Sequence, residues 1–146
     1  MPDPTDRHSG HDGIGTPREA RERAHALLYE AEAKDEAGTD VVAGLPVEPE
    51  PYAAEIVAGV TAHQGEIDDL LRRFAKGWDL ERMPAIDRSL LRMSVWELLH
   101  TDLPIGVVIS EAVELAKRYS TDDSHRFVNG MLSRIADEVR GPANAG

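Results

Sequence analysis

The chain has 146 residues, the length of one ordinary domain and enough to bury a core. It contains no cysteine, which excludes a disulfide scaffold and a thiolate metal site and fits a reducing, cytoplasmic environment. The net charge is −11, and residues 34 to 70 supply most of it with one basic and nine acidic groups. Residues 71 to 146 carry eleven groups of each sign, so the second half can still present a basic surface to a polyanion. The polar N-terminus lacks a signal peptide's apolar segment, and no apolar run approaches the roughly 20 residues of a membrane span.

The first helix is predicted to begin after Thr16, behind a polar segment of residues 1 to 15 that we expect to be a disordered tail. Thr16 and Glu19 have the spacing of a capping box, in which each side chain bonds the other's backbone amide. Apolar residues at helical spacing extend the helix to about Ala33. That apolar stripe consists of Ala20, Ala24, Leu27, Leu28 and Ala31.

The opposite face of this helix carries Arg18, Arg21 and Tyr29. A tyrosine beside arginines is suited to stacking on a base or to a protein contact. An ordinary exposed polar face, with Tyr29 packed on a neighbouring helix, is the alternative interpretation. The residue pattern leaves both open.

Residues 34 to 51 are predicted to form a linker, because their glycines and prolines break helices and strands. Apolar residues at helical spacing follow from Tyr52 to Phe74. Gly65 lies between two such stripes, so it either separates two helices or bends one.

Residues 84 to 100 form a helix that is apolar on all sides, which is typical of the central helix of a bundle. Four charged residues interrupt it. We expect Asp87 to pair with Arg88, and Arg92 with Glu97, as structural ion pairs at the rim of a core.

Two helices follow, the first ending near Tyr119 and the second beginning in a cluster of capping residues at 120 to 124. Asn129 and Gly130 lie inside the last helix, where the glycine costs roughly 1 kcal/mol relative to alanine. Such a cost suggests close helix packing or a nearby ligand. With residues 141 to 146 as a flexible tail, the sequence predicts an all-α protein with one compact domain of about seven helices over residues 16 to 140.

The sequence offers no catalytic site. Without cysteine there is no thiol nucleophile, and no phosphate-binding loop or zinc-protease motif occurs. The remaining candidates are the histidines His25, His63, His100 and His125, which are scattered singly and are interpreted as packed or surface residues. We therefore predict no enzyme activity, metal or cofactor.

Binding is the remaining class of function. Arg18, Arg21 and Tyr29 make one candidate surface. A second one combines Lys117, Arg118, Arg126, Phe127 and Asn129. Cations bind phosphate, an aromatic ring stacks on an unpaired base, and an amide reads a base edge, so together the two surfaces would suit RNA. A helical module that binds only proteins fits the pattern equally well.

The stretch from Trp78 to Leu132 resembles the NusB family of transcription antitermination factors, and the composition resembles that of actinobacterial members. The likeness covers about residues 17 to 139 and is specific, because several long segments match in the same order. Those segments are Ala20–Tyr29, Ile86–Arg92, Trp96–Leu99, Leu103–Pro104, Ser110–Lys117 and Phe127–Leu132.

The resemblance implies two three-helix bundles without enzymatic activity. It implies binding to the boxA element of nascent ribosomal RNA together with the ribosomal protein NusE, within the elongating RNA polymerase complex. The RNA-binding positions it implies are Arg18, Arg21, Lys117, Arg126, Phe127 and Asn129. The positions expected to contact NusE are Tyr29, Asp87, Arg92 and Asp123.

One departure from the family pattern concerns the first helix, where Pro17 and Glu19 replace usual basic residues. Each phosphate contact contributes about 0.7–0.9 to the slope of log affinity against log salt concentration. Loss of two contacts would therefore make this slope shallower by almost two units. We therefore expect weak binding to boxA RNA alone and dependence on NusE. The alternative function is a protein adaptor without RNA binding, and the sequence leaves monomer and homodimer open.

Overall fold

The computed structural model describes residues 16–141, which form helices and connections without a strand. The described part therefore confirms the all-α class, with six α-helices where about seven were expected. The expected tails, apart from Gly141, lie outside the described residues. In chain order the elements are α2 (Pro17–Lys34), α3 (Gly38–Ala43), α4 (Pro51–Phe74), the 3-10 helix η1 (Leu80–Arg82), α5 (Ala85–His100), α6 (Ile105–Tyr119) and α7 (Ser124–Arg140). None of the described helices is both long and apolar enough to cross a membrane.

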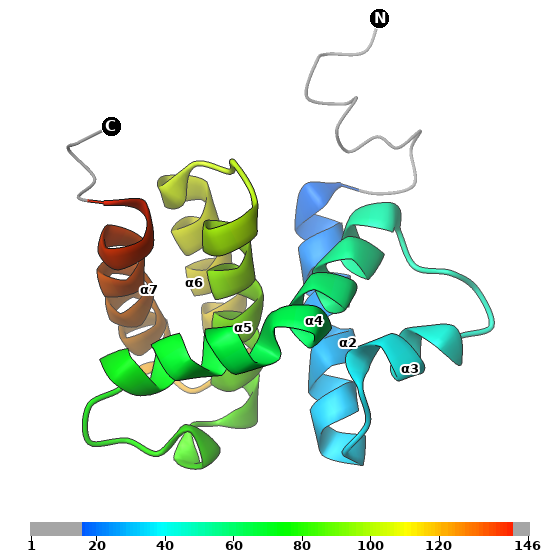
Figure 1. Cartoon of the computed structure of the whole chain (residues 1–146), viewed down its shortest axis with the longest axis horizontal. Helices are drawn as coiled ribbons and strands as arrows, with labels where there is room; N and C mark the ends of the chain where they lie inside the picture. Colours follow the sequence, from blue (N-terminus) through cyan, green and yellow to red (C-terminus); the bar gives the residue numbers. More distant parts are fainter. Residues whose placement is uncertain (1–15, 142–146) are drawn as a thin grey trace, which may run out of the picture. The chain divides into compact units, whose positions relative to one another are not determined.

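The chain divides into two compact units, with the boundary between Thr61 and Ala62 inside α4. The first unit contains α2, α3 and the first part of α4. The second contains the rest of α4, η1, and the three helices α5, α6 and α7, which pack against one another (Figure 1). This division agrees with the two bundles that the resemblance implied.

The start of α2 confirms the predicted capping box. The Glu19 amide donates to Thr16 Oγ1 at 3.0 Å, and the Thr16 amide donates to Glu19 Oε1 at 2.8 Å. These bonds satisfy amides that a helix start leaves without intrahelical partners. All five residues of the predicted apolar stripe are buried. The helix ends at Lys34 and is capped by Asp35, which adopts the left-handed conformation with φ of 54°.

The prediction that residues 34 to 51 form only a linker is wrong, because α3 occupies part of this segment. Gly38 was interpreted as a breaker, yet it is buried at the first position of α3. A Cβ at Gly38 would lie 2.8 Å from Val57 Cγ1 and 2.9 Å from Thr61 Oγ1. Glycine therefore allows α3 to approach α4 closely, which local composition does not reveal.

Helix α4 is continuous through Gly65 and departs from helical geometry at His63, with φ of −117° and ψ of 18°. Thr61 Oγ1 donates to the Val57 carbonyl at 2.7 Å. Such back-bonding by threonine often bends a helix. The structure therefore shows two helical segments that meet at a kink at His63, and the break lies two residues before Gly65.

The prediction that α5 is a central helix is confirmed, because it packs against both α6 and α7 and is buried along most of its length. Its C-terminal end is held by the last residue of α7. The Arg140 guanidinium donates to the carbonyls of Glu97, Leu98, Thr101 and Leu103. A cation here satisfies carbonyls without intrahelical partners and complements the helix dipole.

Substitution of Gly38 tests the close approach of α3. We expect Gly38→Ala to lower the free energy of unfolding by about 1–3 kcal/mol, because the added methyl overpacks the contact with Val57. Gly44→Ala is the matched control, since its Cβ would meet its nearest atom at an ordinary 3.6 Å. Urea denaturation of both variants measures the difference. Equal stability of the two variants would contradict this account of α3.

Candidate functional site

A buried carboxyl group organises the start of α7. Asp87, in the first turn of α5, is only 2% exposed. Its Oδ1 accepts from Ser120 Oγ at 2.6 Å and its Oδ2 accepts from Ser124 Oγ at 2.8 Å. The Ser124 hydroxyl also lies 2.8 Å from the hydroxyls of Ser120 and Thr121. The connection between α6 and α7 is thus fastened to α5 at both of its ends.

This fastening brings the last turn of α6 and the first turn of α7 to one end of the second unit. Lys117 lies in the former and Arg126 in the latter, and both are exposed. Asn129 is also exposed, three residues after Arg126, and residues at this spacing are neighbours on a helix surface. The structure therefore presents a cation and an amide side by side on α7.

Phe127 is half-buried, and its ring stacks with that of Trp78 at a centroid distance of 5.6 Å and an interplanar angle of 29°. Trp78 is 52% exposed and belongs to the connection between α4 and α5. Arg88 holds that connection to α5 by donating to the carbonyls of Leu80 and Met83. Sequence reasoning did not predict Trp78 as a site residue, because only the fold brings it to Phe127. We call Trp78, Lys117, Arg126, Phe127 and Asn129 the α7 surface.

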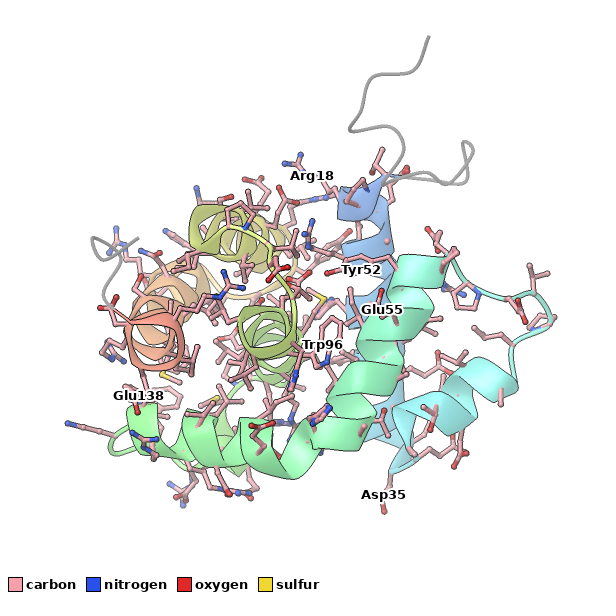
Figure 2. All side chains as sticks on the ribbon, turned by 45° about the horizontal axis from the view of Figure 1, so that its top comes forward. Arg18, Asp35, Tyr52, Glu55, Trp96 and Glu138 are labelled. Atoms are coloured by element: carbon pink, nitrogen blue, oxygen red, sulfur yellow. The ribbon has the colours of Figure 1, made fainter. Side chains whose placement is uncertain are left out.

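In the first unit, Arg18 is exposed in the first turn of α2, at the end away from Asp35 (Figure 2). The expectation that Arg21 also lies on an exposed face is wrong, because Arg21 is 4% exposed. Its guanidinium carbon lies 5.8 Å from the centroid of the Tyr52 ring of α4, a cation–π contact. His25, interpreted from the sequence as a packed or surface histidine, is also buried. An arginine stem can pack against an aromatic ring, and charge alone does not predict this.

The four positions expected to contact a protein partner differ in exposure. Tyr29 is 41% exposed and Asp123 is exposed, whereas Asp87 is buried in the hydroxyl network. Arg92 has a side chain only 12% exposed, and it donates two hydrogen bonds to Asp68 of α4, at 2.8 and 3.0 Å. Two parallel bonds of this kind fix an arginine firmly. In this chain Asp87 and Arg92 hold helices together. Of the four positions, Tyr29 and Asp123 are the exposed ones.

The interpretation of His63 and His100 as single, scattered residues is wrong. Their rings stack at a centroid distance of 4.1 Å, with Glu66 beside both. They are 37 positions apart in the sequence (100 − 63), so no local spacing reveals them. Among the described residues they form a group able to hold a metal ion, outside the α7 surface.

The NusB family model matches residues 18–137. The chain belongs to the NusB family. Its relatives include the transcription antitermination protein NusB of Salinispora arenicola, which is 47% identical over 82% of this chain and 94% of the relative. The corresponding protein of Beutenbergia cavernae is 50% identical over 81% of this chain and 87% of its own. The chain is thus a transcription antitermination factor of a non-enzymatic family, as the resemblance implied.

Solved structures show the same fold. NusB from T. maritima superimposes with a TM-score of 0.76 at 36% identity, covering 83% of this chain and 90% of that protein. A structure of the antitermination factors NusB and NusE in complex with dsRNA matches with a TM-score of 0.70 at 28% identity, covering 83% and 96%. In that structure the NusB protein is bound in a complex with NusE and dsRNA.

Asp87→Ala tests the role of the buried carboxyl group. We expect a loss of about 2–4 kcal/mol in the free energy of unfolding, because two bonded hydroxyls lose their acceptor. Asp123→Ala is the control, since Asp123 directly precedes α7 but its side chain makes no capping hydrogen bond. Thermal unfolding followed by circular dichroism measures both. A loss for Asp123→Ala as large as for Asp87→Ala would argue against the network as the organising contact.

Proposed function

We propose that this protein binds the boxA element of nascent ribosomal RNA through the α7 surface, together with NusE. The observation that carries the proposal is the exposed Trp78 ring stacked on Phe127, next to the exposed Arg126 in the first turn of α7. The known complex of a relative with NusE and dsRNA supports RNA as the ligand and NusE as the partner. The complex would act in the cytoplasm on the elongating RNA polymerase.

Each part of the α7 surface suits a different part of RNA. Arg126 and Lys117 supply positive charge for phosphates, and Asn129 has the donor and acceptor needed at a base edge. The Trp78 and Phe127 rings offer an aromatic platform, where stacking contributes about 1–3 kcal/mol per base. The combination favours unpaired bases, because paired bases in an RNA helix do not expose their faces.

Weak binding in isolation is part of the proposal. In α2 Arg18 is exposed, whereas Arg21 is buried against Tyr52. Arg21 therefore stabilises helix packing and is not available to a phosphate. Pro17 and Glu19 add no positive charge, and the whole chain carries −11. NusE would then supply the missing affinity. We assign direct contact with NusE to Tyr29 and Asp123. Asp87 and Arg92 have an indirect role, because their internal hydrogen bonds hold their helices in place.

Variants of the α7 surface test the RNA site. We expect Arg126→Glu with Phe127→Ala to weaken binding to a boxA-type oligonucleotide at least about tenfold, through the lost phosphate contact and the lost stacking. Trp78→Ala should weaken it in the same direction. Arg72→Glu is the matched control, because Arg72 is an exposed arginine on α4 that pairs with the neighbouring Asp69 in a surface contact. Fluorescence anisotropy in the presence of NusE measures the affinities.

Unchanged affinity in the α7 variants, with an unchanged melting temperature, would favour the alternative function. In that case the chain would be a helical protein adaptor, either monomeric or homodimeric. Sedimentation of the free protein and of its mixture with NusE distinguishes those states. Retention of NusE by every α7 variant would show that the protein contact is separate from the RNA site.

A salt series tests the dependence on NusE. We expect the protein alone to bind boxA-type RNA weakly at physiological salt, with a shallow slope of log affinity against log salt, because few phosphates are contacted. Adding NusE should raise the affinity, and restoring an arginine by Glu19→Arg should steepen the slope by about 0.7 on single-stranded RNA. Tight binding of the protein alone, unaffected by NusE, would contradict the proposal.

A further inference from the structure

Two histidines and a glutamate converge in the second unit. His63 Nδ1 lies 3.6 Å from Glu66 Oε1, and His100 Nε2 lies 3.5 Å from the same oxygen. One ligand atom from each residue lies within 4.8 Å of the other two. The side chains are 43%, 53% and 32% exposed for His63, Glu66 and His100, so an ion can reach them from solvent.

We infer that His63, Glu66 and His100 form a binding site for a divalent transition metal, with Zn²⁺ as the best-suited ion. Two imidazole nitrogens and one carboxylate oxygen are typical zinc ligands, and zinc sites with three protein ligands keep a fourth position for water. Tetrahedral ligands about 2.0–2.1 Å from zinc lie roughly 3.4 Å apart. Two of the three ligand pairs are already near that spacing. Because the two rings are stacked and an imidazole nitrogen binds a metal in its ring plane, one ring has to turn out of the stack to complete the site.

The two imidazole ligands disfavour Mg²⁺ and Ca²⁺ at this site. Mg²⁺ and Ca²⁺ take oxygen ligands almost exclusively, whereas Zn²⁺, Cu²⁺, Ni²⁺ and Co²⁺ bind imidazole well. A site exposed to solvent and built from one carboxylate and two imidazoles should therefore discriminate strongly between Zn²⁺ and Mg²⁺.

The local fold prepares these side chains. His63 is the residue at which α4 departs from helical geometry, and Glu66 follows three residues later on the same helix. His100 is the last residue of α5, where carbonyl groups with partial negative charge favour a cation. The His100 imidazole also lies beside the Trp96 ring, at 6.3 Å between centroids. A bound ion would clip the second part of α4 to the end of α5.

Metal titration of the full chain tests this site independently of RNA and NusE. All samples carry His8→Gln and His11→Gln, which removes the two N-terminal histidines as competing ligands. We expect Co²⁺ to give the intense visible absorption of a tetrahedral site, with one equivalent bound and displaced by Zn²⁺. At zinc about 100 times above Kd the ratio of folded to unfolded protein rises about 100-fold, which raises Tm by several degrees.

Two variants separate a specific site from surface binding. Glu66→Gln with His100→Gln should abolish the cobalt spectrum and the zinc-induced rise in Tm. His125→Gln, which changes a half-buried histidine outside the group, should leave both intact. The inference is overturned if the parent protein gives no tetrahedral cobalt spectrum, if the double variant binds cobalt as the parent does, or if Mg²⁺ raises Tm as much as Zn²⁺.

Discussion

The second unit depends on the burial of the Asp87 carboxyl group. A carboxyl group removed from water is costly unless hydrogen bonds replace its hydration, and here Ser120 and Ser124 supply them from the two ends of one short connection. Because both serines must reach Asp87, α6 has to end and α7 has to begin beside the first turn of α5. The exposed positions of Lys117 and Arg126 follow from that requirement. The RNA-binding surface that we propose is therefore built on an internal contact.

The sequence predicts those parts of the fold that depend on local signals. The capping residues Thr16 and Glu19 act within one turn, and the spacing of apolar residues identifies the central helix α5 without knowledge of its neighbours. Helix α3 was missed because the role of Gly38 depends on Val57 and Thr61, which belong to another helix. A glycine that allows close packing and a glycine that breaks a helix look alike in sequence.

The candidate sites depend on distant contacts, and the sequence predicts them only in part. Arg126, Phe127 and Asn129 were predicted from their side-chain chemistry and from the family resemblance, whereas Trp78 enters the site only through its ring contact with Phe127. Arg21 has the positive charge of a phosphate ligand, but its side chain is buried against Tyr52. The meeting of His63 with His100 likewise requires two helices to be placed in space. Residue type indicates what a side chain can do, and packing decides whether it is available.

The two tryptophans have opposite environments. Trp96 is 5% exposed within α5, whereas Trp78 is 52% exposed and rests on Phe127. Red-side emission and access to iodide or acrylamide therefore belong to Trp78, while Trp96 contributes a shielded, blue-shifted component. A base stacked on Trp78 would quench the first component and leave the second unchanged. The unlabelled protein thus carries an optical probe of the α7 surface and an internal reference within one chain.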